Sequence, residues 1–160
     1  MPNPLRLGLP LALLAVVSLA ACDSPAVACT LIGCEDAYSV TLAPAGDALT
    51  SGRYDVVASA AGRTESCSFT VTVDTDLAVG VSNESDGCRG AFAFTPAAEA
   101  GRAQVRVLFP PLEDDVILRV HRDGAELASV RVDPVYVGQY PNGPDCGAGC
   151  RQANTAVRVP

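Results

Sequence analysis

The sequence predicts an all-β fold, an antiparallel β-sandwich stabilised by disulfides, and two features of the residue pattern carry that prediction. From Tyr38 onward, short stretches alternate between hydrophobic and polar residues, as strands with one buried face do. No stretch keeps a helical period over three turns, and residues 96–103 have room for a single turn at most. About seven to nine short strands at this spacing are typical of a sandwich or a small barrel.

The expected strands are separated by glycine, proline, asparagine and aspartate, which interrupt regular structure. In the clearest strand, residues 66–73, one face is apolar and the other carries serine and threonine. We expect burial of the apolar face, because transfer of such side chains out of water is favourable. That face consists of Cys67, Phe69, Val71 and Val73. The other expected strands are 38–43, 53–60, 77–82, 91–95, 104–109, 116–122, 126–133 and 155–159.

Asp123 and Gly124 lie between two alternating stretches and predict a tight β-hairpin. Both central positions of such a turn need a positive φ, which this residue pair tolerates well. Arg119 and His121 then point outward from the first strand of the hairpin. The inward face of that strand is expected to be Val116, Leu118 and Val120.

The composition fits one domain with few aromatic residues in its core. The chain has 160 residues, with 4 Phe, 4 Tyr and no Trp, so valine, leucine and alanine must fill most of the interior. Its formal net charge is −7, and no basic patch is visible in the sequence. Because an acidic surface repels a phosphate backbone, the sequence argues against binding of nucleic acid.

The N-terminal residues 7–21 form an apolar segment after a short and weakly basic lead. The segment is shorter than the roughly 20 residues of a membrane-spanning helix, and its length is that of a signal-peptide core. It ends in Leu19-Ala20-Ala21-Cys22, which resembles a bacterial lipobox. The resemblance implies a lipoprotein signal peptide over residues 1–21 and a lipidated Cys22 that carries diacylglycerol and a further acyl chain such as palmitate.

Lipidation would anchor the mature chain to the membrane through Cys22, since two or more acyl chains anchor stably. Residues 22–28 then form a short lipidated tether, and residues 29–160 form a single sandwich domain. Asp23 resembles the signal that retains lipoproteins in the inner membrane of enteric bacteria, but other lineages do not follow that rule. The inner and the outer membrane therefore both stay open. The alternative is ordinary secretion, with Cys22 as a plain cysteine.

Six cysteines remain after Cys22, and an even number in an exported domain predicts disulfides, because the periplasm is oxidising. We expect the two in the middle of the sheet region to pair with each other and the two terminal clusters to pair across the chain. Closing a loop of over 100 residues contributes about 4 to 5 kcal/mol in the chain-entropy model. The alternative is local bridges, 29–34 and 146–150. The six are Cys29, Cys34, Cys67, Cys88, Cys146 and Cys150.

A metal site or a redox motif is a poor match to these cysteines. The spacings of the two clusters, C-x4-C and C-x3-C, fit a zinc site poorly, and exported thiolates usually oxidise. A redox C-x-x-C is absent from the sequence. We therefore expect no cofactor and no metal on the cysteines.

The C-terminal stretch 140–153 contains Pro-Asn-Gly-Pro followed by C-x3-C. It is similar to a PNGP-x-C-x-x-x-C segment of small uncharacterised lipoproteins of Gram-negative bacteria, which also carry an A-C-x-x-x-G-C segment like residues 28–34 here. That resemblance brings no activity with it. Prolines and Asn-Gly favour a rigid turn, so we interpret the stretch as a disulfide-locked turn, with a partner-binding loop as the alternative.

Residues 52–58 resemble the G-x-Y-x-V-x-A strand of transthyretin-like and carboxypeptidase-regulatory-like sandwiches. The resemblance implies a sandwich of that type. An immunoglobulin-like architecture is the other form considered, although the Cys…Trp…Cys signature of true immunoglobulin domains is missing.

Catalytic motifs are missing from the sequence. There is no G-x-S-x-G, no phosphate loop and no H-E-x-x-H, and the single histidine, His121, is expected on an outward face. Two acidic clusters are candidates for calcium, which needs six to eight oxygen ligands, but neither has the spacing of an EF-hand, so we interpret them as solvated loops with calcium as the alternative. The clusters are Asp74, Asp76, Asn83, Glu84 and Asp86, and Glu113, Asp114 and Asp115.

These observations predict a non-enzymatic binding or structural module in the cell envelope, anchored by lipid and facing the periplasm or the cell surface. Its expected partner is an envelope protein or a glycan of unknown identity. The alternatives are a calcium-dependent adhesive or ligand-binding domain and, third, an envelope hydrolase.

Overall fold

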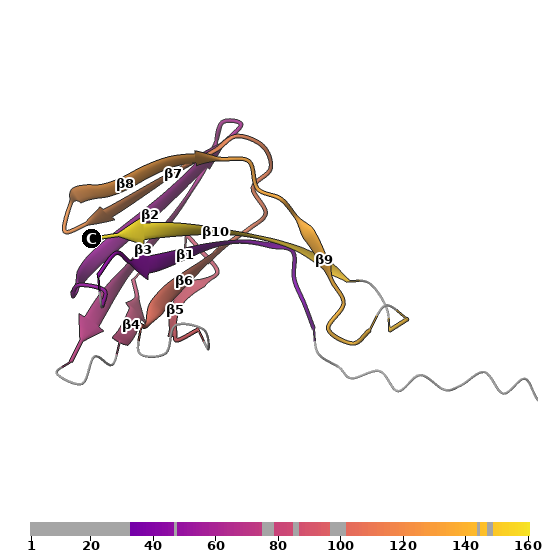
Figure 1. Ribbon diagram of the computed structural model, residues 1–160. Helices are drawn as coiled ribbons and strands as arrows, with labels where there is room; N and C mark the ends of the chain where they lie inside the picture. The colour runs from indigo at the N-terminus through magenta and orange to yellow at the C-terminus, as the bar shows by residue number, and fades with distance from the viewer. Residues whose placement is uncertain are drawn as a thin grey trace, which may run out of the picture.

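The computed structural model describes residues 33–46, 48–74, 79–84, 87–96, 102–143, 145–146 and 149–160. Within these ranges the chain is all-β, and its strands form two five-stranded sheets that pack together (Figure 1). The predicted disulfide-stabilised β-sandwich is confirmed. None of these ranges contains a helix long and apolar enough to cross a membrane.

The first sheet has the strand order β5-β6-β1-β10-β9, and the second has the order β4-β3-β2-β7-β8. The strands of the first are β1 (Ala37–Pro44), β5 (Gly90–Phe94), β6 (Gln104–Phe109), β9 (Val137–Gln139) and β10 (Cys150–Val159). The strands of the second are β2 (Gly52–Ala60), β3 (Arg63–Val73), β4 (Val79–Asn83), β7 (Val116–Arg122) and β8 (Ala125–Val132).

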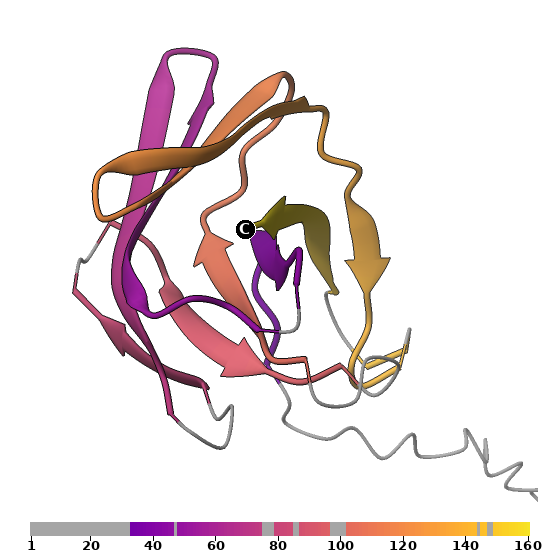
Figure 2. The ribbon, with the colours of Figure 1, turned by 60° about the vertical axis from the view of Figure 1, so that its left-hand side comes forward.

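The core lies between the two sheets, which face each other across it (Figure 2). On β3, Cys67, Phe69 and Val71 are buried, as the alternation predicts, and Val73 is half-buried against the core. The first sheet supplies the opposing layer, and burial of both layers provides the hydrophobic stabilisation. The buried residues of β1 and β6 are Tyr38, Val40, Leu42, Val105, Val107 and Phe109.

The β7–β8 hairpin confirms the turn prediction. Asp123 and Gly124 have φ angles of 51° and 82°, as a two-residue turn with positive φ at both positions requires. The inward face of β7 is buried, and Arg119 is exposed on the other face. The bounds of β6 and β7 agree with the predicted ranges, since strong alternation and clear breakers define both strands.

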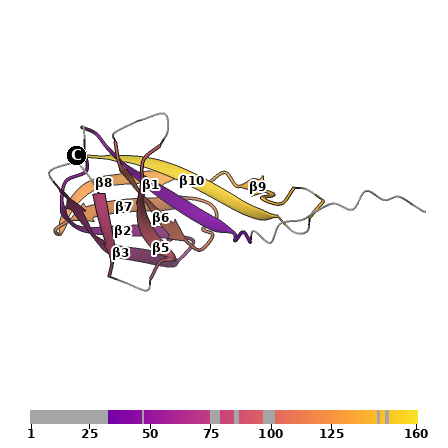
Figure 3. The same ribbon diagram turned by 90° about the horizontal axis from the view of Figure 1, so that it is seen from below.

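The C-terminal part of the chain differs from the prediction. Strand β10 begins at Cys150 instead of residue 155, and it pairs with β1 in parallel, so the first sheet is mixed and not fully antiparallel (Figure 3). The short β9 was not predicted and pairs with the start of β10. Residues 150–154 are mostly polar and follow a turn motif, so the local pattern does not indicate a strand. Pairing with β1 provides the missing stabilisation.

Candidate binding site

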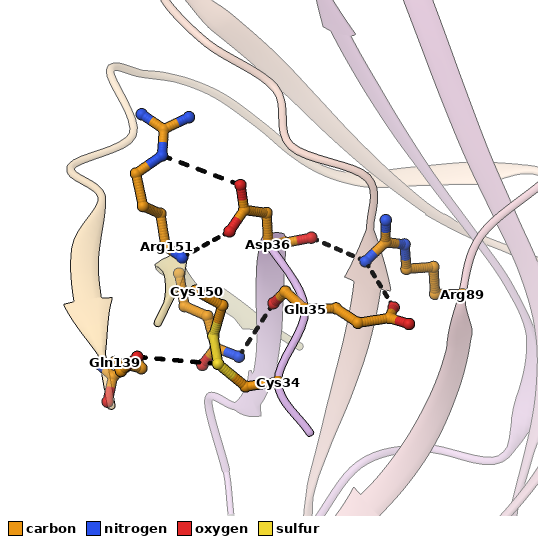
Figure 4. The surroundings of a disulfide bond; sticks show 8 residues. Cys34, Glu35, Asp36, Arg89, Gln139, Cys150 and Arg151 are labelled. Atoms are coloured by element: carbon orange, nitrogen blue, oxygen red, sulfur yellow. Dashed lines mark hydrogen bonds and ion pairs between the residues drawn. A yellow bond between two sulfur atoms is a disulfide. The ribbon is translucent and has the colours of Figure 1, made fainter. Parts of the chain in front are cut away.

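A disulfide between Cys34 and Cys150 holds the start of β1 against the start of β10, with 5.7 Å between the two Cα atoms (Figure 4). This bond joins the two terminal cysteine clusters, as the cross-paired arrangement expects, and Cys150 does not form the local bridge to Cys146. Cys146 is itself disulfide-bonded. The lipidation and disulfide predictions for Cys22 and Cys29 lie outside the described residues. In the sheet region, Cys67 pairs with Cys88.

Polar contacts surround the Cys34–Cys150 bond (Figure 4). The backbone N–H of Arg151 donates to the Asp36 carboxylate at 2.7 Å. The guanidinium of Arg89 donates to the Glu35 carboxylate at 3.0 Å and to the carbonyl of Asp36 at 2.7 Å. These contacts tie the residues before β1 to β10 and to the segment before β5. They position one end of the outer face of the first sheet.

The predicted turn is present in the described residues 140–143 and 145–146, which follow Gln139, the residue paired with Cys150. The backbone N–H of Gly143 donates to the carbonyl of Tyr140 at 2.9 Å, and that of Cys146 donates to Gly143 at 3.2 Å. Gly143 has a φ of 90°, a conformation that favours glycine. The described chain starts at this same pole, beside β9 and the beginning of β10 (Figure 1). The turn and the start of the body therefore lie together.

The outer face of the first sheet is hollowed by three adjoining depressions of about 420, 410 and 470 Å³. All three are lined by Arg106 of β6, and neighbouring pairs share Ser39 or Asn154. We call this continuous surface the Arg106 groove. Its lining from the strands and loops is Ser39, Thr41, Phe92, Phe94, Gln104, Arg106, Val135, Val137, Gln152, Asn154 and Arg158, with Glu35 and Arg89 at one end.

Arg106 occupies the middle of this face, opposite Phe92 on β5 and Thr41 on β1. Its guanidinium carbon lies 4.5 Å from the centroid of the Phe94 ring, a cation–π arrangement. Its Nε is buried and has no hydrogen-bond partner. Among the described residues, no oxygen accepts a hydrogen bond from this guanidinium. Because a buried donor without a partner is costly, the site is incomplete as the protein stands.

Asn154 adds a second group of donors to the groove. Its side-chain oxygen accepts hydrogen bonds from the hydroxyl of Ser39 at 3.0 Å and from that of Thr41 at 2.9 Å. These bonds fix the amide with its oxygen occupied and its two N–H donors without a partner in the described part of the chain. Next to Arg106, the groove therefore also contains the N–H donors of the Asn154 amide, which are available to an acceptor of a ligand.

The charge of the groove is opposite to that of the chain. Within the described part of the chain, its lining includes the cations Arg89, Arg106 and Arg158 and a single acidic residue, Glu35, which pairs with Arg89 at 3.0 Å. The whole chain has a net charge of −7. A local excess of positive charge on an acidic protein attracts anions to this surface.

Two aromatic rings form the β5 side of the groove. Phe92 is 42% exposed, and its ring centroid lies 6.4 Å from that of Phe94. The edge of β5 beyond them is covered by Asn83 of β4. The Asn83 side chain accepts from the backbone N–H of Ala91 at 2.7 Å and donates to its carbonyl at 3.1 Å. The rings are thus accessible from the face, whereas the strand edge beside Ala91 is already paired.

Four of the residues considered for calcium contact other side chains or backbone of the protein. Glu84 contacts Thr70 and lies 2.9 Å from Arg53, and the Asn83 amide is held by Ala91. Asp115 pairs with Arg131, whose guanidinium lowers the pKa of that carboxyl. Glu113 pairs with Arg151 at 2.9 Å, and Asp76 and Asp86 lie outside the described residues. No group of three or more potential metal ligands occurs within the described ranges.

His121 lies on the outward face of β7, with Nε2 3.7 Å from the Glu126 carboxylate. Its neighbour on β2 is Asp55, whose carboxylate accepts a hydrogen bond from the Ser68 hydroxyl at 2.5 Å. The hydroxyl therefore contacts the carboxylate. A nucleophile activated by a base needs the opposite order, with the hydroxyl bound to the histidine. None of the depressions described above is lined by His121.

Comparison with protein-family models, with curated proteins and with solved structures found no significant match for this chain. The functional interpretation therefore depends on the geometry. Sequence reasoning missed Arg106, because an outward arginine in an alternating strand is usually a solvated side chain. Its setting depends on Phe94, Thr41 and Asn154, which come from other strands.

Proposed function

We propose that this chain is a lipid-anchored lipoprotein of the bacterial cell envelope, whose folded body acts as a non-enzymatic binding module. The segment ending at Cys22 resembles a lipobox and supports the anchor. The Cys34–Cys150 and Cys67–Cys88 disulfides support export, because such bonds persist in an oxidising compartment such as the periplasm.

The anchor would keep the body near the bilayer. The chain between Cys22 and Gly33 reaches at most about 40 Å even when fully extended. The start of β1 is bonded to β10 at one pole, so that pole would face the membrane. The Arg106 groove begins beside this pole and runs along the side of the sandwich, so it stays open toward the periplasm or the cell surface.

The observation that carries the binding role is the Arg106 groove. It combines a buried donor without a partner, an exposed aromatic ring and a charge opposite to that of the chain. A folded protein gains nothing from such an arrangement by itself, since an unmet buried donor lowers stability. A bound partner that supplies acceptors would complete it.

Metabolic labelling with palmitate tests the anchor. Cells that express the chain should incorporate the label into it and retain the protein in the membrane fraction. Cys22→Ala should abolish both, whereas the neighbouring Ser24→Ala, which leaves the lipobox-like segment intact, should change neither. Persistent label in Cys22→Ala would contradict the proposed anchor.

Photo-crosslinking in the native envelope tests the binding role. A photoreactive phenylalanine analogue is placed at Phe92 in the groove or at Ile117, an exposed apolar residue on the outer face of the second sheet. We expect a discrete crosslinked product from position 92 and none from position 117. Equal products from the two positions would contradict a specific role for the groove.

A further inference from the structure

We propose that the Arg106 groove binds an acidic oligosaccharide, with the Arg106 guanidinium bound to a carboxylate of the sugar chain. This inference rests on the proposed binding function and adds the chemical class of the ligand. Four properties of the groove support this ligand class: its hydrogen-bond donors, its positive charge, its exposed aromatic ring and its length across the sheet.

The donors select an acceptor that carries negative charge. The Arg106 guanidinium and the Asn154 amide offer N–H groups to the same part of the groove, because Asn154 lines two of the depressions that Arg106 lines. The acceptor of that amide is already occupied by Ser39 and Thr41. A carboxylate has only acceptors, and guanidinium–carboxylate bonds are among the strongest polar contacts in proteins.

Among the residues that the structure describes, no carboxylate accepts a hydrogen bond from Arg106. Glu35, the acidic residue in the lining, is held by Arg89 at the end of the groove. Arg158 lies at the other end, in a depression whose lining contains no acidic residue. The groove therefore carries positive charge along its length and has room for an external anion at its centre.

The aromatic side favours a sugar over other anions. The face of an aromatic ring is electron-rich, so it attracts the polarised C–H groups of a sugar ring while hydroxyls on the sugar rim remain free for polar contacts. Phe92 is exposed for such stacking. The amides of Gln152 and Asn154 also line the groove, where they could form hydrogen bonds with sugar hydroxyls.

The shape and the covered edge argue for a chain of sugars and against an acidic peptide. Three depressions connect across the sheet from β5 to β9, so the groove accommodates several linked units. A peptide commonly binds to a sheet by adding a strand at a free edge. Here the Asn83 side chain already pairs with the backbone of Ala91 on the edge strand β5.

Binding of labelled galacturonic acid oligomers to the complete lipoprotein in non-ionic detergent tests the proposal. A chelator is present throughout, so that calcium cannot bridge protein and ligand. Two further probes separate the alternatives: the same oligomers with their carboxyls reduced, and an oligoglutamate of similar charge. We expect binding of the acidic oligomers that weakens as ionic strength rises, and at least tenfold weaker binding of both other probes.

Variants locate the site. Arg106→Gln should weaken binding of the acidic oligomers at least tenfold, and Arg106→Lys should weaken it less, because the charge is retained without the planar guanidinium. Phe92→Ala should weaken it severalfold. The matched control is Arg119→Gln, an outward arginine on the second sheet, which should stay within twofold of wild type. Thermal unfolding of every variant establishes that it is folded.

Each contrary result overturns a defined part of the proposal. Equal binding of the carboxyl-reduced oligomer would exclude the carboxylate as the recognised group. Tighter binding of oligoglutamate would make the ligand an acidic peptide. Failure of all three probes, or equal losses in Arg106→Gln and Arg119→Gln, would exclude this ligand class at this groove. The palmitate and crosslinking experiments test the lipid anchor and the binding role of the groove, and their results do not depend on whether the ligand is an acidic oligosaccharide.

Discussion

The outer faces of the two sheets differ in where their polar side chains find partners. On the second sheet, a group around Asp55 is paired within the protein: Arg53 lies 2.9 Å from Glu84 and 3.6 Å from Asp55, and Ser68 donates to Asp55. On the first sheet, Arg106 has a buried Nε without an acceptor and the Asn154 amide keeps its donors unused. Arg53 on the second sheet is thus paired within the protein, whereas Arg106 on the first sheet keeps a buried donor without a partner in the described part of the chain.

This difference supports the proposed binding role of the outer face of the first sheet. Exposed ion pairs such as those of Arg53 contribute little to stability, but they leave nothing for a ligand to complete. The buried Nε of the half-buried Arg106 has no partner among the described residues and costs stability, which supports the proposal that a ligand completes the groove. Four predictions test the contrast between the faces, from the largest expected effect to the smallest.

Asn154→Ala should lower the free energy of unfolding by about 1 to 3 kcal/mol, because the hydroxyl of Thr41, which is only 5% exposed, loses its acceptor. Urea titration followed by circular dichroism measures the change. The control is Gln152→Ala, an exposed neighbour on the same strand, which should change stability by less than about 0.5 kcal/mol. Equal losses in both variants would mean that the Asn154 contacts add nothing.

Arg106→Met should raise the free energy of unfolding by about 1 kcal/mol, because it removes a buried donor without a partner and keeps an unbranched side chain against Phe94. The matching change on the other sheet, Arg53→Met, should lower stability by less than about 1 kcal/mol, since its ion pairs are exposed. Changes in unfolding free energy of opposite sign in the two variants would confirm that the two arginines differ in whether they are paired. A clear loss in Arg106→Met would show that this arginine is satisfied in the free protein.

Acid should remove a small contribution that depends on Asp115. Its pKa lies below the usual value because Arg131 donates hydrogen bonds to the carboxylate. A lowered pKa in the folded state stabilises the fold above the unfolded-state pKa, and that stabilisation is lost as the pH falls through the folded-state pKa. Wild type should therefore be slightly more stable than Asp115→Asn near neutral pH, and the two should converge once the pH has fallen below the folded-state pKa of Asp115. An unchanged difference would contradict the pairing.

Calcium should not change the midpoint of thermal unfolding. Among the described acidic residues, Glu84, Glu113 and Asp115 are paired with arginines. Scanning calorimetry with millimolar calcium and with chelator should give the same midpoint. A rise with calcium that the chelator reverses would instead support the calcium-dependent alternative, since a ligand that binds the folded state raises its stability.

The alternating strands and the hairpin could be predicted from sequence because local patterns determine them. Cys67, Phe69 and Val71 share a face by the geometry of any extended strand, and burial of that face follows from their apolar character. The turn at Asp123 and Gly124 follows from the φ angles that these residue types accept. The early start of β10 could not be predicted, because its polar residues 151 and 152 are held in extended form by pairing with distant strands.

The candidate site could be predicted only in part. The lipobox-like segment, the six cysteines and the turn motif after residue 140 are visible in the sequence, because each depends on neighbouring residues. The position of Arg106 in the groove is not visible in the sequence, because it depends on which side chains lie beside Arg106 on β5, β1 and β10. Strand order alone decides that Phe92 and Thr41 become its neighbours.

The sequence by itself determined the fold class, the buried faces of the main strands and the resemblance to a lipobox at Cys22, since short-range spacing and side-chain type suffice for all three. Only the tertiary structure decided that β1 and β10 run in parallel beside the Cys34–Cys150 disulfide, and that Arg106 lies in a groove without an acceptor. The physical reason is the sequence separation of the residues in contact. Contacts between residues more than 100 positions apart depend on the packing of the whole sandwich, so they produce no local periodicity in the sequence.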